Sequence, residues 1–155
     1  MKRANILRLI AVVAVVVLAS MTTGCLKAAI TGKIEPAKLT LAPEDVTFDG
    51  TLTLTMTGLL GAANYDALDV EFFQGDAAVE GLDIKNVKIN LKVSPLGKVD
   101  SVKLKDIEGL AVPEALWDAE QKLTANKAKF TVKPGAGFGL DPVVIEVELE
   151  KANPV

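Results

Sequence analysis

Hydrophobic and polar residues alternate along most of the chain beyond residue 37. Successive side chains of an extended strand point to opposite faces, so each alternating segment predicts a strand with one apolar and one polar face. Such segments are residues 39–41, 52–56, 68–72, 87–93, 102–104, 130–132 and 143–149. Strands of this kind bury their apolar faces by stacking two sheets, so we expect an antiparallel β-sandwich of about seven strands over residues 37–151. The expected core includes the inward residues Leu54, Val70, Phe72, Ile89, Leu91, Leu104, Phe130 and Ile145.

The alternation changes phase inside one of these strands. Ile84 and Val87 are both apolar, although a strict period of two would place them on opposite faces. One extra residue in the strand restores a common face, so we expect a β-bulge at Lys85-Asn86.

Residues 113–127 have the features of a short helix instead. Pro113 suits the first position of a helix, and Glu114 complements the helix dipole. Leu116, Ala119 and Leu123 would then share one face. We expect a single helix here, which covers an edge or an end of the sandwich.

The stretch 52–104 has a recognisable order of features. An alternating strand is followed by a turn containing Asn64, by a strand ending near Gly75 and by Val79-Glu80-Gly81. This order resembles the late-embryogenesis-abundant type 2 (WHy) domain, with Asn64-Tyr65 in place of that family's Asn-Pro pair. The resemblance implies a small β-sandwich of a kind that some bacterial lipoproteins carry, and it implies no particular ligand.

The first residues of the chain carry a different pattern. Lys2, Arg3 and Arg8 are followed by an unbroken apolar run over residues 9–19 and by small or polar residues up to Gly24. A positive start, a short apolar run and small residues before a cleavage point are typical of a secretory signal. A membrane-spanning helix needs roughly 20 apolar residues, so a retained anchor is the least favoured interpretation.

Cys25, the one cysteine of the chain, directly follows Thr22-Thr23-Gly24. This sequence resembles the lipobox of bacterial lipoproteins, with Thr22 where that family usually has an aliphatic residue. The resemblance implies that residues 1–24 are removed and that Cys25 carries acyl chains such as palmitate on its sulfur and its new amino terminus. Two or more chains hold a protein stably in a bilayer, and residues 25–36 would form a lipidated tether. Plain secretion with an unmodified cysteine is the alternative.

Composition excludes several classes of function. After Cys25 the chain has no histidine, no arginine and no second cysteine. It therefore offers no disulfide, no Ser-His-Asp or Cys-His arrangement and no metal site built on imidazole or thiolate. Three of the 17 basic residues precede Cys25 and all 20 acidic residues follow it, so the mature chain has a net charge near −6. We expect no nucleic-acid partner, no enzymatic activity, no cofactor and no metal centre, with a carboxylate-pair hydrolase as the remaining enzymatic alternative.

Lysines supply the candidate binding surface. Lys88, Lys92, Lys103 and Lys105 are expected to share the outer face of one hairpin, where they would contact anionic headgroups or peptidoglycan. Charged residues on outward strand faces also prevent edge-to-edge aggregation, which is the plainer interpretation.

Three further patterns have plain structural explanations beside functional ones. The threonines of residues 51–57 fit a solvated strand face, with glycan or ice binding as the alternative. Residues 135–139 fit a glycine-rich loop, because they lack the ending of a phosphate-binding loop. The aspartates fit unconnected surface loops, with a calcium site as the alternative; they are Asp45, Asp49, Asp66, Asp69 and Asp141.

These observations favour an exported lipoprotein whose sandwich binds or scaffolds without catalysis. Its anchor at Cys25 would lie in the cell membrane. In the lipoprotein family an aspartate directly after the cysteine retains the protein at the inner membrane, and here Leu26 takes that position. For an organism with two membranes, the resemblance therefore implies the outer membrane. Partners would be another envelope protein or a cell-wall component. The alternative is a carrier that holds an apolar ligand or lipid between the sheets, although the aliphatic composition favours a filled core.

Overall fold

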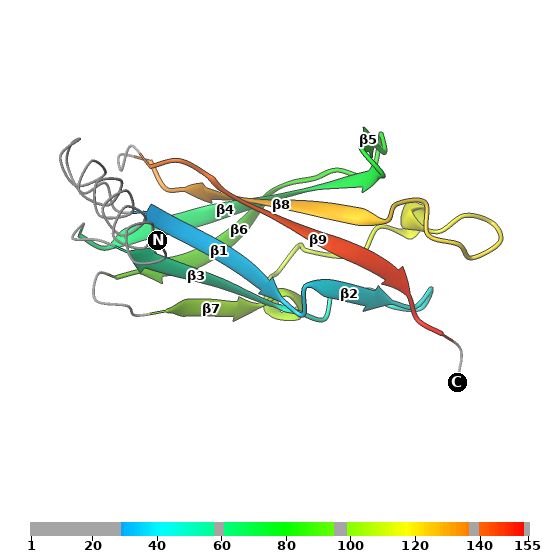
Figure 1. Ribbon diagram of the computed structural model, residues 1–155, viewed down its shortest axis with the longest axis horizontal. Coiled ribbons are helices and arrows are strands. Elements are labelled where there is room, and N and C mark those ends of the chain that lie inside the picture. Colours follow the sequence, from blue (N-terminus) through cyan, green and yellow to red (C-terminus); the bar gives the residue numbers. More distant parts are fainter. Residues whose placement is uncertain (1–28, 58–60, 95–98, 137–139, 154–155) are drawn as a thin grey trace, which may run out of the picture.

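A computed structural model gives the fold, and it describes residues 29–57, 61–94, 99–136 and 140–153. Within these ranges there are nine strands and two short 3-10 helices (Figure 1). The strands are β1 (Ala29–Glu35), β2 (Lys38–Leu41), β3 (Thr51–Thr57), β4 (Ala63–Gln74), β5 (Ala77–Ala78), β6 (Ile84–Val93), β7 (Asp100–Lys103), β8 (Lys127–Pro134) and β9 (Val143–Lys151). The 3-10 helices are η1 (Leu104–Asp106) and η2 (Glu114–Leu116). The predicted signal peptide and Cys25 lie outside the described residues.

The strands form two sheets that pack face to face, which confirms the predicted β-sandwich. The smaller sheet has the order β1-β3-β7. The larger has the order β2-β9-β8-β4-β5, and β6 pairs with β4 on the side that β5 also occupies. Pairing is antiparallel except between β2 and β9, which are parallel. This exception corrects the expectation of a purely antiparallel sandwich, and β1 and the two-residue β5 are strands that the alternation did not predict.

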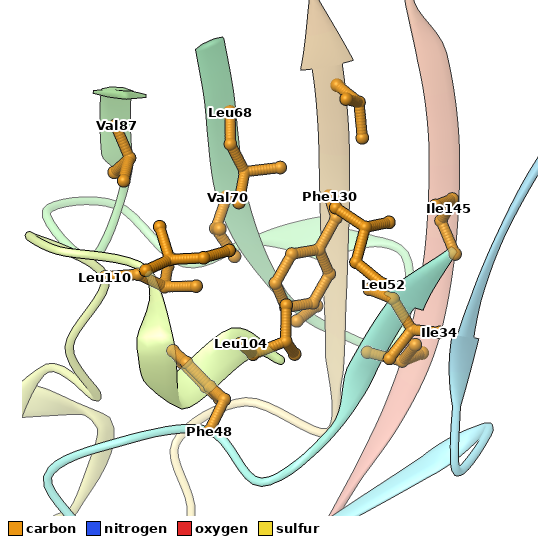
Figure 2. Close-up of a cluster of buried hydrophobic side chains, with 14 of the residues drawn as sticks. Ile34, Phe48, Leu52, Leu68, Val70, Val87, Leu104, Leu110, Phe130 and Ile145 are labelled. Carbon is orange, nitrogen blue, oxygen red and sulfur yellow. The ribbon is translucent and has the colours of Figure 1, made fainter. Parts of the chain in front are cut away.

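The inward side chains of both sheets build one apolar core (Figure 2). Of the predicted core residues, only Ile89 is half-buried rather than buried, because β6 is an edge strand. Phe48, from the loop between β2 and β3, is fully buried and lies 6.3 Å from Phe72 and 6.0 Å from Phe130 between ring centroids. The segment between β7 and β8 contributes further buried side chains, among them Leu110 and Leu116. The space between the sheets is therefore filled by side chains.

The predicted domain boundary at residue 37 is wrong. Residues 29–35, assigned to the tether, form β1 and pair along their whole length with β3, from Ala29 opposite Thr57 to Glu35 opposite Thr51. The sandwich therefore begins at Ala29 at the latest.

A glycine hides β1 from the alternating pattern. Gly32 takes the inward position between Ile30 and Ile34, where β1 crosses close to β9 (Figure 1). A Cβ atom on Gly32 would lie 2.6 Å from Ile145 Cδ1 and 2.8 Å from Val143 Cγ1. Close packing of the two strands thus requires a residue without a side chain, which removes one apolar position from the expected sequence pattern.

The predicted helix over residues 113–127 is also wrong. Only Glu114–Leu116 is helical, as a single 3-10 turn. The Asp118 carboxylate accepts hydrogen bonds from the backbone N–H groups of Glu120 and Lys122 at 2.9 and 2.8 Å. A side chain that accepts these N–H groups competes with a helix for them, and the chain forms a loop instead. No helix in the described part of the chain is long and apolar enough to span a membrane.

Two local features of β4 and β6 complete the comparison with the expected strands. The predicted bulge at Lys85-Asn86 is confirmed, because the β4–β6 register shifts between Leu68 and Val70 and Asn86 has a left-handed φ of 56°. Asn64, expected in a turn, lies inside β4 opposite Lys92.

Candidate functional site

The four candidate lysines do not share the outer face of one hairpin, so this prediction is wrong. Lys88 and Lys92 belong to β6 of the larger sheet, Lys103 to β7 of the smaller sheet and Lys105 to η1. β6 pairs with β4, and β7 pairs with β3, so β6 and β7 do not form the expected hairpin. The apolar face of β6 covers the core from the larger sheet, and the apolar face of β7 covers it from the smaller sheet. The chain therefore passes from one sheet to the other between β6 and β7.

An open groove lies where the edge strands β6 and β7 face each other. It has a volume of about 410 Å³ and is lined by Lys88, Ile89, Asn90, Val102, Asp106, Ile107 and Glu108. Ile89, Val102 and Ile107 pack against the core and give the groove an apolar base. Lys88 lies on the β6 side, and two acidic residues lie on the η1 side.

Only some residues of this groove could be identified from the sequence. The alternating pattern singled out Lys88, placed Ile89 in the core, and gave no role to Asp106, Ile107 or Glu108. These residues come together only because β6 and β7 belong to different sheets, which alternation along each strand does not reveal. The partial signal was the outward lysines of β6.

Charge follows a strand-by-strand pattern on the outer face of the larger sheet. The ion pairs that cross between its strands are Lys38–Glu148 and Lys38–Glu150 (3.4 Å each), Lys127–Glu146 (3.7 Å), Lys133–Asp69 (2.6 Å) and Lys129–Glu71. In the order β2, β9, β8, β4, β6, the strands are thus basic, acidic, basic, acidic and basic. Among the described residues, Lys88 and Lys92 of β6 have no ion-pair partner. The alternation of charge therefore ends at an edge strand on which these two lysines are not neutralised by an acidic side chain.

A second depression, of about 470 Å³, lies over β2 and β9. Its charged lining includes Lys38 with Glu148 and Glu150, and both glutamates raise the pKa of Lys38 above its ordinary value. Lys127, also in the lining, pairs with Asp76 at 3.9 Å. The lysines and acidic residues of this depression already form ion pairs with one another. They are therefore less available to a ligand than Lys88 in the groove between β6 and β7.

Asp69 holds the bulge of β6 in place. Its Oδ1 accepts the Asn86 N–H at 2.7 Å, and its Oδ2 lies 2.6 Å from Lys133 Nζ, which also donates to Asn86 Oδ1 at 3.0 Å. Burial alone would raise the pKa of Asp69, but the Asn86 N–H and the Lys133 ammonium outweigh it and hold the pKa below its ordinary value. The carboxylate form therefore stabilises the fold.

We expect Asp69→Ala to lower the free energy of unfolding by about 1–2 kcal/mol near neutral pH, because a charge-assisted hydrogen bond and the ion pair are lost. A depressed pKa contributes stability that is present above the unfolded-state value of 3.8 and is lost as the pH falls through the folded-state value. Urea unfolding should thus show a difference from wild type at about pH 7 that shrinks as the pH falls below about 4. Glu148→Ala, at an exposed ion pair, should change stability by less than about 0.5 kcal/mol. A pH-independent effect of Asp69→Ala would contradict this role.

The remaining candidates are not brought together. Cys25 and residues 137–139 of the glycine-rich loop lie outside the described residues. The proposed calcium ligands are scattered, with Asp69 held by Lys133, and the described ranges contain no group of three or more acidic or cysteine side chains that would hold a metal ion. The threonines of β3 alternate with its buried residues, and Thr53 is only 7% exposed between Lys33 of β1 and Ser101 of β7.

Comparisons with known proteins show little similarity. No family model matches the chain, and no curated protein matches it. Among solved structures, the chain is similar to the apo form of the Calx CBD1 domain, with 16% identity, a TM-score of 0.38, and coverage of 80% of this chain and 98% of that one. It is also similar to part of a β-glucosidase from Erythrobacter marinus, with 13% identity, a TM-score of 0.38, and coverage of 79% of this chain but 15% of the glucosidase.

Proposed function

We propose that this chain is an exported cell-envelope lipoprotein, anchored through acyl chains on Cys25, whose β-sandwich binds or scaffolds a neighbouring envelope component without catalysis. The observation that carries the proposal is the lipobox-like sequence Thr22-Thr23-Gly24-Cys25 directly after an apolar run. The membrane would be the cell membrane, or the outer membrane in an organism with two.

The short distance between Cys25 and β1 supports a role close to the membrane. β1 begins at Ala29, and four Cα-to-Cα steps span at most about 14 Å when fully extended. With an acylated Cys25, the end of the sandwich where Ala29 lies opposite Thr57 would face the lipid headgroups. Partners are therefore expected among membrane-proximal envelope components.

The interior of the sandwich supports surface binding over the carriage of an apolar ligand. Phe48, Phe72 and Phe130 are fully buried between the sheets, and the ring of Phe48 packs against both of the others. A lipid carrier needs a cavity at this place, whereas the grooves described above lie on the outside of the molecule.

Cys25→Ser should abolish metabolic labelling of the protein with palmitate, because the substitution removes the sulfur that accepts the acyl chain. The precursor should accumulate with its signal peptide, and the measurement is gel fluorography of labelled cells together with immunoblotting of the same lanes. Thr23→Ser, two residues before the cysteine, is the matched control and should keep the label. Palmitate incorporation into the Cys25→Ser protein at the wild-type level would contradict the proposed anchor.

A further inference from the structure

The outer edge of β6 offers unpaired backbone groups to the groove. Lys92 lies opposite Asn64 of β4, but its N–H donates to Asp100 Oδ2 of β7 at 2.7 Å and so points away from β4. Backbone N–H and C=O groups of a strand alternate in direction. The β4–β6 register shifts between Tyr65 and Ala67, but the burial of β6 itself alternates without interruption from Val87 to Val93. Asn90 and Lys88, which are in step with Lys92 along β6, therefore direct their backbone groups away from β4 and into the groove that both residues line.

Both ends of this edge are blocked, and the blocks define a short window. At one end the Asp100 side chain occupies the Lys92 N–H. At the other end, the bulge at Lys85-Asn86 bends the strand, and the Asn86 N–H is bonded to Asp69. Natural proteins blunt an edge strand by such means, and here they leave Lys88 to Asn90 accessible. The window is long enough for one short added strand.

The side chains around the window define what such a strand would look like. Its residues opposite Lys88 and Asn90 would share the outer face of the sheet with them, and its alternate residues would face Ile89, Val102 and Ile107. An added strand would therefore carry polar residues on the outer face of the sheet and apolar residues at the alternate positions, which face the groove.

Charge selects the sign of the polar residues. Each basic strand of the larger sheet lies beside an acidic one, as in the pairs Lys133–Asp69 and Lys38–Glu148, but β6 has its acidic neighbour β4 on one side only, and its outer side is open. β6 is basic and lies at the edge, so the complementary neighbour is acidic. A second copy pairing through its own β6 would bring lysines against lysines, which is unfavourable.

We propose that the edge of β6 binds a short extended segment of another protein as an added strand, with acidic residues that reach the ammonium groups of Lys88 and Lys92 and apolar residues at the alternate positions. This inference rests on the proposed binding function and names the class of its partner. Backbone hydrogen bonds come from Lys88 and Asn90, while Lys92 contributes its ammonium group. Asp106 and Glu108 on the far wall exclude acidic residues from the inward positions, and so disfavour ligands that are uniformly anionic.

The test uses the full-length protein purified in detergent and two fluorescein-labelled peptides. The acidic probe is Val-Glu-Val-Thr-Val-Glu-Val, whose acids have the same spacing as Lys88 and Lys92, and the basic probe has Lys in place of Glu. Fluorescence anisotropy should show that the acidic probe binds at least about tenfold more tightly. The double variant Lys88→Glu/Lys92→Glu should reverse this preference. The matched control Lys103→Glu/Lys105→Glu, which changes lysines outside the window, should leave it intact.

A second pair of measurements tests strand addition itself. Methylation of the acidic probe at the backbone nitrogens that would bond to β6 should abolish binding without any change to the protein. Hydrogen exchange should show new protection at the amides of Lys88 and Asn90 when the unmethylated probe is bound. Equal binding of both probes, undiminished binding of the methylated probe, or a dimer that Asn90→Pro dissociates would overturn the proposal. These readouts do not depend on acylation, so they fail separately from the palmitate test of Cys25.

Discussion

Phe130→Ala should lower the free energy of unfolding by about 3–5 kcal/mol, the range typical of a fully buried phenylalanine. Phe130 lies in the middle of β8 with no exposed surface, and its ring meets that of Phe48 edge-on at 6.0 Å. Truncation removes both the buried ring and its aromatic contact, and it leaves a cavity between the sheets. The measurement is urea unfolding of the full-length protein, followed by circular dichroism at β-sheet wavelengths.

Val144→Ala is the matched control, because Val144 lies on the neighbouring strand β9 and is 57% exposed on the outer face. It should change stability by less than about 0.5 kcal/mol. A Phe130→Ala effect as small as that of the control would contradict the described core.

Gly32→Val should destabilise the protein by about 3 kcal/mol, because a new side chain would overlap the close crossing of β1 and β9. The crossing leaves no room for it, since even a Cβ atom would lie 2.6 Å from Ile145 Cδ1 and 2.8 Å from Val143 Cγ1. Thr31→Val places a side chain of similar size at the neighbouring position, which faces outward and is exposed. Urea unfolding of both variants should show a large loss of stability for Gly32→Val and a negligible change for Thr31→Val. Equal effects would mean that β1 does not pack against β9 in this register.

Much of the fold follows from a period of two along the chain. Strands such as β9, in which valine, isoleucine and leucine alternate with glutamate, can be predicted from the sequence because one face is buried and the other is exposed to solvent. The pattern fails where packing demands an exception. At Gly32 the close packing of β1 against β9 leaves no room for a side chain, so an expected apolar residue is missing from the pattern. At Asp118 the carboxylate accepts hydrogen bonds from backbone N–H groups that a helix would use.

The candidate site was harder to predict than the fold. Alternation shows that Lys88 and Lys103 both face outward, but it does not show to which sheet each strand belongs. Strand neighbours depend on contacts between distant segments, such as Lys133 with Asp69. The sequence does contain one sign of which strands are neighbours, because β8 is basic whereas β4 and β9 are acidic. The same comparison of charges singles out Lys88 and Lys92 of β6, which have no ion-pair partner among the described residues.

The most direct test of the lipoprotein account is the intact mass of the protein extracted from membranes with detergent. The account predicts a chain that begins at Cys25 and carries the added mass of the acyl groups, all of it located on the first residue by fragmentation. A chain that retains residues 1–24, or one that is cleaved there but has an unmodified Cys25, would contradict it.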